Sequence, residues 1–202
     1  RMKVLGITGG VGAGKSTVLM YLKEHYGARV IQADQVGHLL QQPHESCYRR
    51  IVELFGTTVL NADGTISRPK LGAIVYTDPQ KMARLNAIMH PSIRRWIKSE
   101  VEAEQKRGCV PFVTVEAALL LEDHYDEICD EIWYVHTDDA VRIKRLQESR
   151  GYSEEMCRRI MANQKNECDF RAACQLVIDN SSDIVQNTYE QMDKGLREHG
   201  FL

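Results

Sequence analysis

The chain has 202 residues, with 26 Lys and Arg against 28 Asp and Glu, and its formal net charge is -2. Because the basic residues are scattered, the charge pattern gives no support to a nucleic-acid or membrane-surface role. No apolar run approaches the roughly 20 residues that span a bilayer. The 6 cysteines form no CxxC pair. We therefore expect one compact cytoplasmic domain with free thiols and no membrane or nucleic-acid partner.

The first predicted elements are a strand over Val4–Thr8 and a helix over Lys15–His25, joined by a glycine-rich loop. The loop fills every position of the phosphate-loop pattern GxxxxGK[ST]. Glycines let backbone N–H groups converge on a polyphosphate, and the helix N-terminus adds partial positive charge. The predicted nucleotide-binding residues are Gly9, Gly10, Val11, Gly12, Ala13, Gly14, Lys15, Ser16 and Thr17.

Two side chains of this loop have predicted chemical roles. Lys15 is expected to bridge the outer phosphates of ATP as a catalytic residue, and Ser16 to offer its hydroxyl to Mg²⁺. The alternative is a glycine-rich turn that binds no ligand. A full pattern between a strand and a helix favours the nucleotide site.

A second strand is predicted over Arg29–Gln32, and Asp34 follows it directly. The carboxyl ends of parallel strands meet at one edge of a sheet, so we expect Asp34 on the side of the phosphate loop. A carboxylate there can accept the proton of an attacking hydroxyl. The competing interpretation is that Asp34 caps a helix that starts at Gln35.

The long interval from 35 to 107 breaks the alternation of strand and helix. A turn is predicted at Asn61–Gly64, followed by helices over Arg68–Tyr76, Pro79–Met89 and Pro91–Lys106, with Pro91 in a first helical turn. In small-molecule kinases built on this loop, such an insertion usually carries the acceptor substrate. We therefore expect an acceptor-binding helical insertion at 35–107 within a nucleotide-binding core of 1–34 and 108–202.

The rest of the chain returns to alternating elements. Strands are predicted over Pro111–Val115, Glu131–His136 and Leu176–Ile178, with helices over Asp139–Glu148, Ser153–Lys165 and Asp183–Glu198. This alternation predicts an α/β fold, a P-loop NTPase-type three-layer structure with a five-stranded parallel sheet. The segment Asn163–Asn166 lacks the acid of a guanine-reading NKxD motif, which argues against a regulatory GTPase.

Several segments together resemble the dephospho-coenzyme A kinase family. They are Thr8–Thr17, Ile31–Asp34, Phe55–Gly56, Asp63–Arg68, Leu85–Pro91, Leu119–Glu122 and Val177–Asn180. The Asp-Gly-x-Ile-x-Arg and Leu-Asn-x-Ile-x-His-Pro segments are the most specific, because they lie in the insertion. The resemblance implies ATP- and Mg²⁺-dependent phosphorylation of the ribose 3′-hydroxyl of dephospho-coenzyme A. Apart from the resemblance, we expect a monomer.

The resemblance also implies roles for individual residues. Asp34 is the expected catalytic base, and the acceptor is expected to meet Asp34, Arg68, His90, Leu119 and Glu122. Glu116 stands where the family usually has an aspartate, a place suited to the metal ion. Two of these residues also have an alternative without a functional role. His90 could simply pack beside Pro91, and Glu116 could be an acid at the end of a strand that is exposed to water. Ala118 replaces a proline that is usual in the family.

A lid is implied over about 142–171, with Arg145 as a catalytic residue and Arg150 as a second contact to the ATP phosphates. One extra residue between them allows Ser149 to occupy the family's arginine position instead. Asn180 is expected near the adenine, either contacting the base or forming a turn. Two other functions remain open: another P-loop kinase of a nucleoside, nucleotide or small metabolite, and a non-catalytic nucleotide sensor.

Overall fold

The computed structural model describes residues 1–202, which form two compact units. The first unit, here the sheet unit, comprises Arg1–Ile31 and Ala103–Leu202, and the second, the helical unit, comprises Gln32–Glu102. No helix is long and apolar enough to span a membrane.

The sheet has five strands in the order β2-β3-β1-β4-β5. Strand β1 is central and buried throughout, as expected for a strand with neighbours on both sides and helices on both faces. In the parallel register Leu5 pairs with Thr114, and Ile7 pairs with Trp133. All the predicted strands are confirmed, with small shifts at two of them; their bounds are β1 Val4–Thr8, β2 Arg29–Gln32, β3 Val113–Glu116, β4 Glu131–His136 and β5 Leu176–Asp179.

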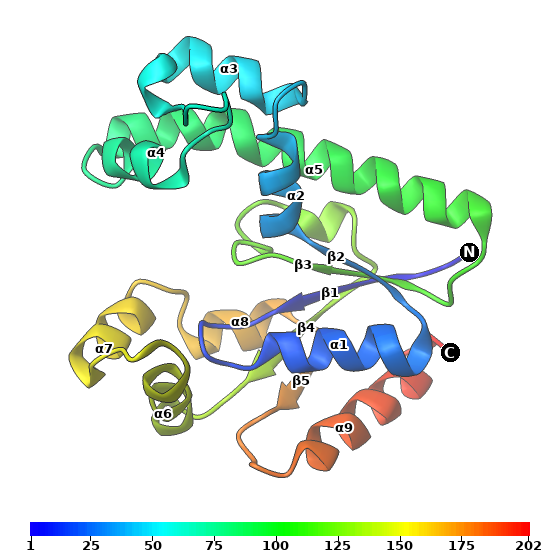
Figure 1. Ribbon diagram of the computed structural model, residues 1–202. Helices are drawn as coiled ribbons and strands as arrows, with labels where there is room; N and C mark the ends of the chain where they lie inside the picture. Colours follow the sequence, from blue (N-terminus) through cyan, green and yellow to red (C-terminus); the bar gives the residue numbers. More distant parts are fainter. The chain divides into compact units, whose positions relative to one another are not determined.

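Helices cover both faces of the sheet, which confirms the three-layer prediction. Helices α1 (Lys15–Tyr26) and α9 (Val185–Glu198) lie side by side on one face (Figure 1). There Trp133 packs into an apolar cluster with Leu22 and Met192. The next residue of β4, Tyr134, points to the opposite face, where its ring stacks on Phe170 of α8 (Glu167–Ala173) at 4.7 Å.

Helices α6 (Asp139–Arg150) and α7 (Glu154–Ala162) form a hairpin around the buried side chains of Ile143, Leu146 and Cys157. The prediction of one helix over Ser153–Lys165 was too long. A turn after Ala162 ends α7, and the Asn166 side chain caps α8 by accepting from the Asp169 N–H at 2.9 Å. The sequence did not predict α8. A short 3₁₀ helix covers Tyr125–Glu127.

The helical unit contains α2 (Ala33–Leu40), α3 (Ser46–Phe55), a short 3₁₀ helix (Thr57–Val59), α4 (Arg68–Val75) and most of α5 (Pro79–Arg107). The predicted turn is confirmed, since the Gly64 N–H donates to the Asn61 carbonyl at 3.0 Å. Helix α2 begins at Ala33, so Asp34 lies inside its first turn. The side chain of Asp34 therefore does not cap a helix that starts at Gln35, as the alternative interpretation supposed.

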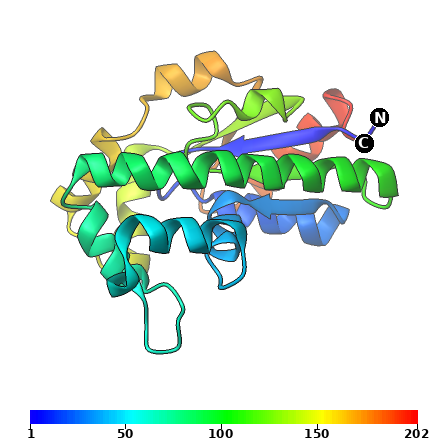
Figure 2. The same cartoon turned by 90° about the horizontal axis from the view of Figure 1, so that it is seen from above.

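The prediction that Pro91 opens a new helix was wrong. Helix α5 is one continuous helix with Pro91 in its interior (Figure 2). A proline removes one N–H donor from a helix. The helix can nevertheless continue when the apolar residues before and after the proline are buried together. Here Met89 and Ile97, on either side of Pro91, are both buried. The Ser92 hydroxyl donates to the Ile88 carbonyl at 2.8 Å, next to the missing bond.

Candidate active site

The phosphate loop occupies the turn between β1 and α1. Gly14 caps α1 with φ 85°, and no acidic residue lies in the first helical turn. A Cβ at Gly14 would collide with the Asn180 amide, which explains why this position needs glycine. The result is a helix N-terminus without a competing carboxylate in its first turn, which favours an anion.

Side chains from two other elements brace this loop from behind. The Ala13 carbonyl accepts from the Thr137 hydroxyl and from the Asn180 amide, both at 2.8 Å. The side-chain oxygen of Asn180, Oδ1, accepts from the Thr188 hydroxyl at 2.6 Å. Asn180 is buried, and its side chain contacts the loop backbone. Its position after β5 therefore serves the shape of the phosphate loop.

Lys15 reaches back across the loop. Its Nζ donates to the Gly9 carbonyl at 2.6 Å and lies 3.6 Å from Oε1 of Glu116, at the end of β3. The side chains of Lys15 and Glu116 are both largely buried. The Lys15 ammonium group is therefore held between the start of the phosphate loop and the end of β3. Thr8 directly precedes Gly9, and its hydroxyl is buried without a hydrogen-bond partner. The local donor set of hydroxyl and carboxylate oxygens fits a hard cation such as Mg²⁺.

The α6–α7 hairpin contacts the tip of the loop. The Val11 carbonyl accepts from Arg142 Nε at 2.9 Å, and the Val11 N–H donates to Gln164 Oε1 at 3.1 Å. The Val11 side chain packs against the Ile143, Leu146 and Cys157 cluster. Sequence reasoning missed both Arg142 and Gln164. No motif marks them, because their contacts join segments far apart in the chain.

The two predicted lid arginines lie differently. Arg145 donates to Thr137 Oγ1 and to the Ser182 carbonyl, each at 3.4 Å, and so lies beside the residues that brace the loop. Arg150 is the last residue of α6, and its guanidinium lies over the Tyr152 ring, 5.9 Å from the centroid. Arg150 lies five residues after Arg145, which places the two side chains about 140° apart around the helix axis. Ser149, four residues after Arg145, lies on the same face of the helix as Arg145.

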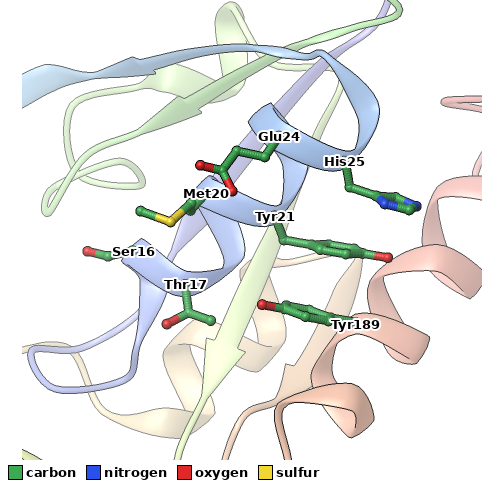
Figure 3. Close-up of a pocket in the computed structure, with 7 residues that line it drawn as sticks. All are labelled: Ser16, Thr17, Met20, Tyr21, Glu24, His25 and Tyr189. Atoms are coloured by element: carbon green, nitrogen blue, oxygen red, sulfur yellow. The ribbon is translucent and has the colours of Figure 1, made fainter.

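A surface groove of about 410 Å³ runs along α1 from the phosphate loop (Figure 3). Ser16 and Thr17, two of the predicted site residues, form one end, and the Tyr21 ring stacks between His25 and Tyr189 in the middle. The hydroxyls of Tyr21 and Tyr26 donate to Asp193, and burial with these bonds raises the pKa of Tyr26 to about 12. This cluster fixes α1 against α9.

The helical unit has its own groove, of about 750 Å³. Asp34 of α2, Arg68 of α4 and His90 of α5 all line it, so the structure brings together the predicted acceptor residues of this unit. Its apolar lining includes Leu71, Val75, Met89 and Ile93. Sequence reasoning missed His38 and Asn86, which also line it; each lies four residues from a predicted residue on the same helix face, and that spacing was the available signal.

The other predicted acceptor residues lie in the sheet unit. Leu119 and Glu122 occupy the turns after β3, where Leu119 is 44% exposed. Glu122 Oε1 lies 3.7 Å from Nζ of Lys165, the residue after Gln164. The predicted acceptor set is therefore divided between the two units.

A parallel sheet in the order 2-3-1-4-5, with a phosphate loop after its central strand, defines a P-loop kinase. Residues 3–186 match the dephospho-CoA kinase family, and the chain belongs to that family. It is therefore an ATP-dependent phosphotransferase with dephospho-CoA kinase activity, which catalyses the final step of CoA biosynthesis.

A curated relative agrees with this assignment, and two solved structures share the fold. A dephospho-CoA kinase of Shouchella clausii is 35% identical over 188 residues, covering 93% of this chain and 94% of the relative. A solved structure from Thermus thermophilus has a TM-score of 0.81 at 25% identity, covering 98% of both chains. The dephospho-CoA kinase structure from Campylobacter jejuni, at 19% identity, TM-score 0.73 and coverage of 99% and 100%, shares the fold.

Proposed function

We propose that the chain transfers the γ-phosphoryl group of ATP directly to the ribose 3′-hydroxyl of dephospho-CoA, with ATP at the phosphate loop and the acceptor in the helical-unit groove. The groove carries this proposal, because phosphate loops are common to many nucleotide-binding proteins. Asp34, Arg68 and His90 line it from three separate helices. A carboxylate, a guanidinium and an imidazole among apolar walls suit an acceptor with a hydroxyl, a diphosphate and an uncharged arm.

Asp34 is the proposed base. Its carboxylate is exposed in the first turn of α2 and lines the groove, so it is accessible to a bound hydroxyl. A base positioned on the attacking oxygen accepts its proton as the bond to phosphorus forms. Arg68 and His90 are proposed to bind the acceptor diphosphate, and Leu119 and Glu122 to complete acceptor binding.

Cationic groups are proposed to stabilise the charge on the transferred phosphoryl group. Lys15 and Arg145 would supply the positive charge, and Arg150 would be a second contact from α6. Ser16 and Glu116 are proposed to hold Mg²⁺, directly or through water, together with phosphate oxygens. The metal would polarise the phosphoryl oxygens of the nucleotide.

The organisation of the chain follows from these roles. We assign acceptor binding to the insertion at 35–107 and the lid to about 142–171, within one kinase domain. We also propose a cytoplasmic monomer without nucleic-acid or membrane partners. The near-neutral net charge of -2 supports the absence of a polyanionic partner.

An acceptor panel tests the proposal. Dephospho-CoA, adenosine, nucleoside monophosphates and shikimate are each offered with ATP and Mg²⁺ in a coupled assay, and only dephospho-CoA is expected to be phosphorylated at a high rate. Asp34→Asn should lower kcat far more than ATP affinity, because the amide cannot accept the proton. Equal losses in both would assign Asp34 a structural role. Tight ATP binding without transfer to any acceptor would favour a nucleotide sensor.

A further inference from the structure

Two side chains, Arg142 of α6 and Gln164 just after α7, bond to both backbone polar groups of Val11 in the phosphate loop. Arg142 Nε donates to the Val11 carbonyl at 2.9 Å, and Gln164 Oε1 accepts from the Val11 N–H at 3.1 Å. Arg142 Nη2 also donates to Gln164 Oε1 at 3.0 Å, so the two side chains are joined to each other. The three bonds form a closed network on Val11.

The network is packed directly against the loop. A Cβ on Gly10 would collide with the Arg142 guanidinium and come within 2.8 Å of Gln164 Oε1, so this pair occupies the space beside Gly10. Only 12% of the Arg142 side chain is exposed, and its carboxylate neighbour Asp139, at 3.7 Å, is 74% exposed. The guanidinium is therefore oriented by the loop carbonyl and by Gln164 more than by a paired acid.

The network also has a rigid support. Gln164 lies two residues after the last residue of α7, and its N–H donates to the Met161 carbonyl at 3.2 Å. Arg142 lies in the first turn of α6, where its N–H donates to the Asp138 carbonyl at 3.0 Å. The apolar cluster of Ile143, Leu146 and Cys157, against which Val11 packs, joins the two helices.

We propose that Gln164 and Arg142 are positioning residues that fix the two peptide groups on either side of the Val11 Cα and thereby orient the N–H groups of the phosphate loop toward the phosphates of ATP. The Val11 N–H donates to Gln164, so this group is bonded within the protein. The other N–H groups of the loop are proposed to bind the phosphates. Adjacent peptide groups are rigid planes joined at one Cα, so fixing the two around Val11 fixes the φ and ψ of that residue and restricts the next groups along the loop. The proposal rests on ATP binding at this loop, as proposed above.

Gln164→Met tests this, because methionine keeps the length of the side chain and removes the acceptor. The matched control is Gln147→Met, at an exposed glutamine of α6. Loss of the bond to Val11 should lower kcat/KM for ATP by about fivefold to tenfold. KM for dephospho-CoA should stay unchanged, and amide hydrogen exchange in the segment 9–14 should rise. Gln164→Glu, which keeps the acceptor, should retain slow exchange in that segment.

Arg142→Met should act in the same direction, and the double variant should lose less than the product of the two single losses, because both residues bond to Val11 and to each other. This variant also keeps the test available if Gln164→Met fails to fold. Wild-type ATP kinetics and wild-type exchange in Gln164→Met or Arg142→Met would overturn the proposal. So would an equal loss for ATP and dephospho-CoA. Inactive wild-type protein would refute the proposed function instead.

Discussion

The two units meet the proposed ligands with different kinds of groups. In the sheet unit most of the proposed phosphate contacts are backbone amides, and side chains such as Asn180, Thr137 and Arg142 hold that backbone from behind. In the helical unit the proposed ligand contacts are the side chains of Asp34, Arg68 and His90, on three different helices. A substitution in the sheet unit should therefore change the loop as a whole, whereas one in the helical unit should remove a single contact.

The largest effect is expected at Lys15, the one loop residue whose side chain is proposed to act on the transferred group. Lys15→Ala should lower kcat by a factor on the order of a hundred or more, because a cation on the transition state is lost. Initial-rate kinetics measure this, with Lys23→Ala, an exposed lysine of the same helix, as the control. A variant that kept its kcat would remove Lys15 from the catalytic residues.

A smaller loss is expected when the backing of the loop is removed. Asn180→Ala leaves the Ala13 carbonyl and the Thr188 hydroxyl each without one buried partner. Unfolding should become easier by about 1–3 kcal/mol, and KM for ATP should rise in the same variant. Urea unfolding and ATP titration would detect the two changes. Asn187→Ala, at an exposed position of α9, is the control, and an Asn180 variant that matched it would show that the brace is dispensable.

In the helical unit we expect a loss confined to the acceptor. Arg68→Ala should raise KM for dephospho-CoA by about tenfold and leave KM for ATP unchanged, since an exposed charged contact contributes on the order of 1–2 kcal/mol. Arg49→Ala serves as the control, because Arg49 is 87% exposed and lies outside this groove. A rise in both KM values would contradict the division of roles between the units.

The smallest effect concerns the end of α5. Arg107 and then Arg29 donate to the Glu104 carboxylate, at 2.6 and 2.8 Å, and hold its pKa below its usual value despite burial. The charged form is thus favoured in the folded state, so the stabilisation is complete above the unfolded pKa of about 4.5 and is lost as pH falls through the lowered folded pKa. Glu104→Gln should destabilise by about 1 kcal/mol at pH 7.

Urea unfolding at several pH values tests this expectation. The difference between the wild type and Glu104→Gln should shrink below pH of about 4.5. Glu102→Gln, exposed on the same helix, is the control and should show no such difference. A difference that stayed constant down to acid pH would mean that Glu104 stabilises the fold by packing alone.

The same contrast between the units appears in what could be predicted. The phosphate loop was predicted residue by residue, since its glycines, Lys15 and Ser16 are dictated by local backbone geometry and one ligand chemistry. In the insertion, Pro91 was predicted to start a helix, α3 was not predicted, and α2 entered only as a helix from Gln35 in the competing interpretation of Asp34. Proline has a strong local preference, but burial of Met89 and Ile97 along one face outweighs one missing hydrogen bond.

The sequence by itself determined the class of fold, the nucleotide loop, the family and the candidate residues, because periodicity and short motifs record local backbone and ligand requirements. Only the tertiary structure decided that Asp34, Arg68 and His90 line one groove, and that Gln164 and Arg142 hold Val11. Gln164 lies 153 residues from Val11. Contacts over such separations depend on how helices pack, and no local pattern in the chain encodes them.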